Sequence, residues 1–235
     1  DPPTPQSQEL GLLGLRMYFS RLALGRLDVL AVPAYDLIKA LHKVIERRGA
    51  GLEAACVVLG LLASKHVTFV CEMQDKVLPT LSTMIRAQGQ APPHLRVAAL
   101  IVFENVAQHH PDLVGPYASM LEFALTLDEP GIEGKEGEAE VRQHAACALR
   151  YLCLPIEQVA RGMEADAIVA YEQNHIPRLF RVAIATIRDD PDPEVRGYAL
   201  SALERLIGGR TSLMTRLIQE GEGLELIVSQ LLPRE

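Results

Sequence analysis

The chain has 235 residues, of which 49% are hydrophobic, and its formal net charge at pH 7 is −7. This length and apolar content are enough for a sizeable core, in one domain or one repeat array. The acidic balance argues against nucleic acid as the main partner, because phosphate binding needs a basic face.

Cysteine usage and hydropathy indicate the compartment. The four cysteines are Cys56, Cys71, Cys147 and Cys153, and none forms a CxxC pair. All but Cys71 lie in apolar helical patterns, which predicts buried free thiols in a reducing compartment. No signal peptide is visible, and the longest apolar run, about ten residues, is too short to span a membrane. We therefore expect a cytoplasmic protein, with the nucleus as the alternative, and no transmembrane segment.

Two kinds of helical pattern alternate along the chain. It opens with a proline-rich stretch, residues 1–9, which we expect to be flexible, and residues 10–235 read as a single repeat array. One kind of helix is predicted at 34–45, 76–87, 116–127, 175–187 and 223–232. The other kind, which we call the anchored helices, is predicted at 11–24, 51–64, 94–107, 140–153 and 193–207. Between two of these helices, residues 128–140 hold six acidic side chains and one lysine, which indicates a solvated loop.

The last anchored helix has clear start and stop signals. Asp192 can accept backbone N–H bonds as an N-cap, and Pro193 suits the first helical position. Gly208 and Gly209 follow the helix, and glycine tolerates the left-handed conformation that often ends helices. No region alternates as strands do, so the sequence predicts an all-α fold.

The anchored helices share one apolar pattern. Their anchors are Gly11, Gly51, Leu95, Val141 and Val195, spaced 40, 44, 46 and 54 residues apart. The residues four, eight and eleven positions past each anchor are all apolar: Leu15, Ala55, Ala99, Ala145, Ala199, Phe19, Leu59, Phe103, Leu149, Leu203, Leu22, Leu62, Val106, Leu152 and Leu206. Chance would fill about half of these positions, and the spacing is close to the period of helical repeat proteins. Neither kind of helix can bury its apolar face alone, so the pairs must stack.

Several stretches resemble armadillo and HEAT repeats. "LIQEGEGLELIVSQLL", "YEQNHIPRLFRVAI" and "CEMQDKVLPTLSTMI" are similar to the armadillo lead-in, in which a short helix turns into a longer apolar one. "DPDPEVRGYALSALERL" resembles a HEAT repeat. The resemblance implies a right-handed α-solenoid of about four to five repeats. It also implies a polar ladder between repeats through the arginine after the anchor, which Arg96, Arg142 and Arg196 match and Leu12 and Leu52 do not.

Both ends of the array are unpaired in this pattern. The chain begins with an anchored helix that has no preceding partner and closes with a helix of the other kind. Because isolated arrays need polar caps, either the chain is a fragment of a longer protein or its end helices cap the array themselves.

The armadillo resemblance implies a binding groove on the concave side of the anchored helices. Residues six and ten positions past each anchor would point into it: Met17, Val57, Ile101, Cys147 and Ser201, then Arg21, Leu61, Asn105, Tyr151 and Arg205. Only Asn105 matches the asparagines of nuclear-import adaptors, and the chain has no tryptophan, so we do not expect a receptor for basic import peptides. Two alternatives stay open: these side chains pack against neighbouring helices, or a basic patch of Arg178, Arg181, Arg188 and Arg216 is the working surface.

No catalytic, cofactor or metal motif is present. "GIEGKEG" at 131–137 has two residues between its first glycines instead of four, and Glu136 follows Lys135 where a phosphate loop needs Ser or Thr. The only histidine cluster, His109 and His110, is expected at the surface end of a helix. Nothing in the sequence identifies a base for Cys71. We therefore expect no enzyme activity and no cofactor.

The sequence leaves three functional hypotheses. The preferred one is a protein-interaction scaffold or adaptor that binds a peptide or helix of another protein in the groove. The second is a co-chaperone that releases nucleotide from Hsp70, since some armadillo proteins do this. The third, a HEAT-like enzyme domain such as a DNA glycosylase, conflicts with the acidic charge.

Overall fold

The computed structural model describes residues 31–47, 51–65, 75–86, 91–125, 135–153 and 165–208, and the single residues 11, 13, 14 and 215. Every regular element in these ranges is helical. The larger helices form four consecutive pairs: α2 (Ala31–Arg47) with α3 (Leu52–Lys65), α5 (Val77–Arg86) with α6 (Pro93–His109), α8 (Ala118–Leu125) with α9 (Lys135–Leu152), and α11 (Ala165–Asp189) with α12 (Pro193–Ile207). Two short elements, α7 (Pro111–Val114) and η2 (Gly115–Tyr117), connect α6 to α8.

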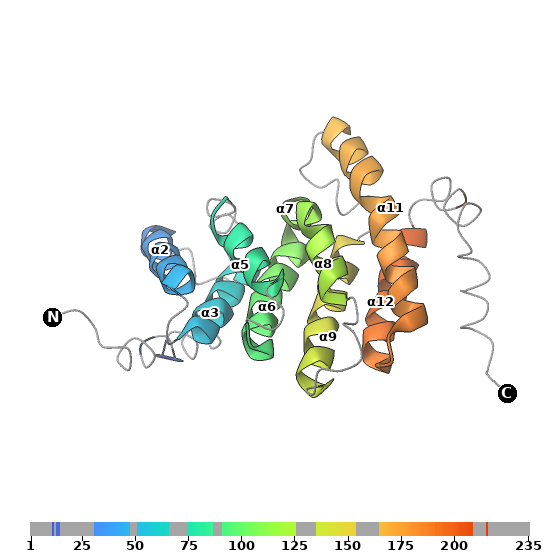
Figure 1. Ribbon diagram of the computed structural model, residues 1–235. Coiled ribbons are helices and arrows are strands. Elements are labelled where there is room, and N and C mark those ends of the chain that lie inside the picture. Colours follow the sequence, from blue (N-terminus) through green and yellow to red (C-terminus); the bar gives the residue numbers. More distant parts are fainter. Residues whose placement is uncertain are drawn as a thin grey trace.

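The four pairs stack side by side in chain order (Figure 1). The anchored helices α3, α6, α9 and α12 pack each against the next and form one layer, the anchored layer. Helices α2, α5, α8 and α11 form the second layer, and each packs against the anchored helix of its own pair. The predicted all-α solenoid is therefore confirmed. The predicted segments 1–9 and 223–232, and nearly all of 11–24, lie outside the described residues.

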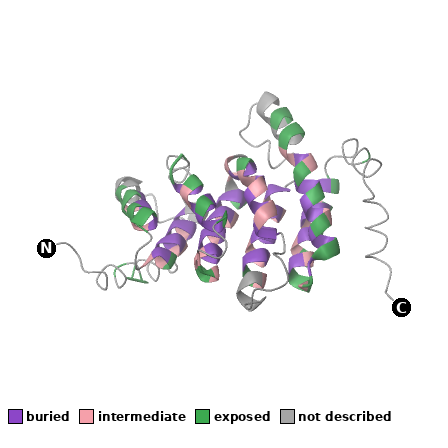
Figure 2. Cartoon of the chain, in the orientation of Figure 1, coloured by how far each residue is buried: buried purple, intermediate pink, exposed green. Residues whose placement is uncertain are grey.

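The core lies between the two layers and between successive anchored helices. The repeated apolar pattern falls there: at the twelve described positions four, eight and eleven past an anchor, no side chain is more than 2% exposed. Phe103 and Leu203 are examples from α6 and α12. Figure 2 shows buried residues where helices face each other and exposed residues on their outer sides. Each pair thus buries its apolar face on the next pair.

The start of α12 matches its sequence signals, but its end differs from the prediction. Asp192 has extended backbone angles and its side chain accepts from the N–H groups of Glu194 and Val195, with Pro193 in the first turn. Gly208 caps the C-terminus with φ −62° and ψ −12°, which is right-handed. The expected left-handed glycine therefore does not occur at Gly208, because a last helical bond from its N–H to the Glu204 carbonyl, 3.0 Å long, keeps it helical.

Two other elements differ from the predicted boundaries. Helix α9 begins at Lys135, so residues 135–140 of the predicted acidic loop are helical. Glu and Ala in this stretch are good helix formers, and acidic side chains favour a helix N-terminus. Helix α11 runs for 25 residues with Pro177 inside it, instead of a short helix turning into a longer one. A short helix followed by a longer one occurs in the preceding repeat, where α7 leads through η2 into α8, although none of the stretches similar to the armadillo lead-in lies there.

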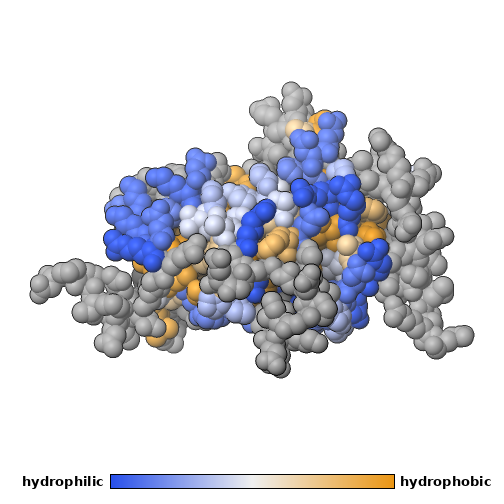
Figure 3. Space-filling model, in the orientation of Figure 1, coloured by the Kyte–Doolittle hydropathy of each residue, from blue (hydrophilic) through white to orange (hydrophobic). Residues whose placement is uncertain are grey.

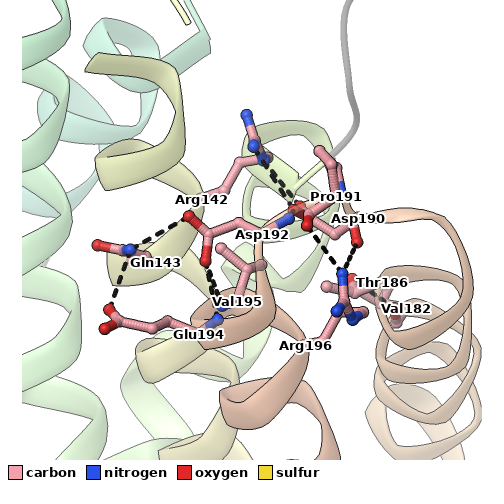
Figure 4. Close-up of polar contacts among 10 residues, drawn as sticks. All are labelled: Arg142, Gln143, Val182, Thr186, Asp190, Pro191, Asp192, Glu194, Val195 and Arg196. Carbon is pink, nitrogen blue, oxygen red and sulfur yellow. Dashed lines mark hydrogen bonds and ion pairs between the residues drawn. The ribbon is translucent and has the colours of Figure 1, made fainter. Parts of the chain in front are cut away.

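A polar joint connects the last two pairs (Figure 4). Arg142 on α9 donates through Nε to Oδ2 of Asp190, in the turn before α12, over 2.7 Å. Arg196 donates to the carbonyls of Asp190 and Pro191 in the same turn. The predicted contact between repeats is therefore present at Arg142, whereas Arg196 bonds within its own pair, to the turn between α11 and α12. Arg96 is also buried, at 7% exposure, and the corresponding turn between α8 and α9 lies outside the described residues.

Candidate functional site

Eight of the ten predicted groove residues lie on the anchored layer, two on each helix. We call this set the anchored face: Val57 and Leu61 on α3, Ile101 and Asn105 on α6, Cys147 and Tyr151 on α9, and Ser201 and Arg205 on α12. The other two, Met17 and Arg21, lie outside the described residues. The repeat pattern therefore places equivalent residues on successive helices, as the sequence predicts.

The anchored face is only partly open to solvent. Cys147 is buried at 8% exposure, and Leu61, Ile101 and Tyr151 pack against the core. The remaining side chains are half-buried. Packing against neighbouring helices, the alternative left open by the sequence, thus accounts for part of this surface.

The α3–α6 half of the face is a close helix contact. A Cβ atom on Gly60 would lie 3.3 Å from Ile101 Cγ2 and 3.4 Å from Asn105 Nδ2. Glycine at this position therefore lets the backbone of α3 approach α6. The Asn105 amide donates to the Ile101 carbonyl, 2.7 Å away on its own helix. To bind a peptide backbone, the Asn105 amide would have to break its hydrogen bond to the Ile101 carbonyl.

A polar cluster joins α6 to α9 in the middle of the face. Nδ1 of His144 lies 3.0 Å from Oε2 of Glu104, and the Cys147 thiol also forms a hydrogen bond with Glu104. Burial acts to raise the pKa of Glu104, but hydrogen bonds from His144 and Cys147 and the charges of His144 and Arg150 hold it below its usual value. The carboxylate is thus charged and engaged by its neighbours.

Carboxylate, imidazole and thiol side by side suggest a nucleophile, but the thiol is not activated. Burial, followed by the charge of Glu104 and the hydrogen bond to it, raises the pKa of Cys147 to about 12. Arg150 and Arg205 act in the opposite direction without reversing the shift. A reactive cysteine needs a lowered pKa, so the raised pKa argues against a nucleophilic role, and the contacts of the cluster connect α6 to α9.

A second polar cluster joins α9 to α12. Its members are Arg150 and Tyr151 on α9 and Tyr198 and Arg205 on α12. The guanidinium carbon of Arg150 lies 4.9 Å from the ring centroid of Tyr151 and 5.6 Å from that of Tyr198. The guanidinium carbon of Arg205 lies 5.9 Å from the Tyr151 ring. Two cations therefore share one aromatic ring, at a distance typical of cation–π contacts.

Sequence reasoning missed Glu104, His144, Arg150 and Tyr198. They stand three or nine positions past their anchors, next to the predicted positions six and ten on the helix surface. Considering the residues three and nine positions past each anchor, together with those six and ten positions past it, would have identified them. The missed residues form two contacts between anchored helices, Glu104 with His144 and Arg150 with Tyr198.

Two arginines of the alternative basic patch pair with carboxylates. Arg178 donates to Glu122 over 2.8 Å, and Arg188 donates to Asp189 over 2.7 Å. Arg181 is exposed on α11, and Arg216 lies outside the described residues. Figure 3 shows hydrophilic side chains gathered over α2 and at the α11–α12 end of the array, with apolar patches between them. Carboxylates therefore engage two of the three described arginines of this patch.

The described residues offer neither a metal site nor a membrane-spanning helix. No group of three or more His, Cys, Asp or Glu side chains within the described ranges could hold a metal ion. No helix in those ranges is both long and apolar enough to cross a bilayer. The burial of Cys56, Cys147 and Cys153 agrees with the prediction of buried free thiols, while Cys71 lies outside the described residues.

The comparisons with known proteins support the fold. Among solved structures, the chain is similar to the designed armadillo repeat protein YIII(Dq.V1)4CPAF in complex with the peptide (KR)4. The TM-score is 0.51 at 15% sequence identity, over 88% of this chain and 95% of that chain. No protein-family model matches the sequence, and neither does any curated protein. The chain therefore has an armadillo-like repeat fold, with no specific member identified.

Proposed function

We propose that this chain is a non-enzymatic interaction scaffold whose anchored face binds an extended peptide or a helix of a partner protein. The observation that carries the proposal is the row of half-buried polar groups on successive anchored helices. Asn105 on α6, Tyr151 on α9 and Arg205 on α12 stand at the same repeat position, and Tyr151 contacts Arg205 directly.

The chemistry of this row suits recognition of a peptide. An amide can bond an extended backbone, a tyrosine offers a rigid amphipathic contact, and an arginine can bind a carboxylate or phosphate. Tyr and Arg are also common among the residues that dominate binding energy. The apolar residues of α3 and α6 beside this row, Leu61 and Ile101, add the apolar surface that interfaces use at their centre.

The fold similarity supports the same reading. The designed armadillo protein is described in complex with a peptide. Its peptide is basic, whereas Arg205 of the anchored face and the neighbouring Arg150 would repel a basic peptide here. The expectation that this chain is not a receptor for basic import peptides is thus retained.

Short random peptides displayed on phage, selected on the intact protein, would test the proposal. Affinities of the selected peptides are then measured by fluorescence anisotropy. We expect the double variant Asn105→Ala with Arg205→Ala to lose about 2 kcal/mol, near thirty-fold, because it removes two polar contacts at the row's ends.

A matched control uses the other layer. Arg178→Ala with Arg181→Ala also replaces two long or polar side chains by alanine, but on α11. The control should bind like the wild type. If the α11 variant loses affinity while the anchored-face variant does not, or if no peptide is retained, the proposal is wrong.

A further inference from the structure

In the cluster of Arg150, Tyr151, Tyr198 and Arg205, two guanidinium carbons lie within 5.9 Å of the Tyr151 ring centroid. The Tyr151 ring is shared by both cations, and Arg150 also lies over the Tyr198 ring. One terminal nitrogen of Arg150 donates to the Tyr151 hydroxyl over 3.0 Å. Ring contacts and this bond restrict the rotamers of Arg150, so less ordering is left to occur on binding.

Arg150 and Arg205 differ from three other arginines of the array in having no carboxylate partner among the described residues. Arg142, Arg178 and Arg188 each form an ion pair with a carboxylate. Within the described residues, neither Arg150 nor Arg205 does so. The carboxylate of Glu104 interacts electrostatically with Arg150, but it already accepts bonds from His144 and Cys147.

The hydrogen-bonding capacity of Arg150 is also incompletely used. A guanidinium has five N–H donors. Nε of Arg150 is buried and has no hydrogen-bond partner in the described part of the chain. Its bond to the neutral Tyr151 hydroxyl is weaker than one to an anion would be. Two cations on one tyrosine ring, neither in an ion pair with a carboxylate among the described residues, favour an anionic group beside them.

We infer that Arg150 and Arg205, framed by Tyr151 and Tyr198, form a subsite for an acidic group of the bound peptide, either a carboxylate or a phosphate. The inference rests on the proposed function, since it names the ligand chemistry of the same face. It places the acidic residue of the peptide over the α9–α12 junction. The apolar residues of α3 and α6 then meet a less polar part of the same peptide.

The test compares the peptides that three forms of the full chain select from one random phage-displayed library. The wild type should enrich Asp or Glu at one position. The charge-reversed variant Arg150→Glu with Arg205→Glu should enrich Lys or Arg there, because the sign of the subsite is inverted. The neutral variant Arg150→Gln with Arg205→Gln should lose the charge preference and bind the wild-type peptide at least about tenfold more weakly.

Three synthetic forms of the wild-type-selected peptide identify the anion. They carry Glu, phosphoserine or Gln at the enriched position, and their affinities are measured by fluorescence anisotropy. Tighter binding of the Glu form indicates a carboxylate site, and tighter binding of the phosphoserine form indicates a phosphate site. If the Gln form binds as well as both, the inference is overturned.

The matched control is Arg178→Gln with Arg181→Gln on α11, which should keep the affinity within about twofold. Circular dichroism melts show whether each variant is folded. Should the neutral double variant not fold, Arg205→Gln alone serves instead, because Arg205 is only half-buried; we expect it to lose at least about fivefold.

The outcomes separate the two proposals. If the wild type retains no peptide, the proposed function is wrong, and this inference falls with it. If peptides bind through the anchored face without an acidic preference, or if that preference survives in the neutral variant, only the subsite is wrong.

Discussion

Arg142 and Asp190 form a buried ion pair between α9 and the turn before α12, with 2.7 Å between Nε and Oδ2. Their side chains are 9% and 1% exposed. Oδ1 of Asp190 also accepts from the backbone N–H of Asp192, 2.9 Å away, and Asp192 in turn caps α12. One carboxylate therefore connects the packing of two repeats to the start of a helix.

Arg142→Met should lower the free energy of unfolding by about 3 kcal/mol or more, because it leaves the Asp190 carboxylate buried without its cation. Urea unfolding at pH 7, followed by circular dichroism, measures this loss. Arg178→Met is the control, since its ion pair with Glu122 is exposed and should contribute less than about 1 kcal/mol. Equal losses in the two variants would show that the buried pair has no special role.

Leu203→Asp should abolish or greatly lower the thermal transition. Leu203 is 2% exposed in the core of α12, and an unpaired buried charge costs several kcal/mol, comparable with the stability of many domains. Leu200→Asp, three residues earlier on the same helix and 46% exposed, should melt close to the wild type. A cooperative wild-type-like melt of the Leu203 variant would contradict the assignment of the repeat core.

Glu104 should make stability depend on pH. Its pKa in the folded protein lies below the ordinary value of 4.5, so its contribution is present above that value and is lost as pH falls through the folded pKa. The free energies of unfolding of the wild type and Glu104→Gln, measured with urea, should therefore differ at pH 7 and converge towards pH 3. Glu204→Gln, an exposed change on α12, should leave the pH dependence unaltered. If the difference in free energy of unfolding between the wild type and Glu104→Gln is the same at both pH values, this role is refuted.

Cys56 and Cys147 should resist alkylation in the folded protein. Burial raises the pKa of both thiols to about 12, so the thiolate fraction at pH 8 is on the order of 10⁻⁴. Mass spectrometry after treatment with iodoacetamide should find both sites modified at least about a hundredfold more slowly than in urea. Rapid native modification of Cys147 would mean that His144 activates the thiol, and the structural reading of that cluster would fail.

The sequence by itself determined the repeat architecture. Apolar residues four, eight and eleven past each anchor predicted the buried face of each anchored helix, and the described ones, such as Leu59 and Phe103, are buried. Asp192 and Pro193 predicted the start of α12. These features were readable because helix periodicity and capping are local: they depend on residues within a few positions of each other.

The tertiary structure alone decided which side chains meet across the anchored layer. Glu104 and His144 are 40 residues apart, and Arg142 and Asp190 are 48 residues apart. The contact between Arg150 and Tyr198 likewise joins two helices. Helix periodicity gives the face on which a residue lies, but not the axial offset between neighbouring helices. That offset is set by how the side chains pack between the helices and by where two backbones approach closely, as α3 does to α6 at Gly60.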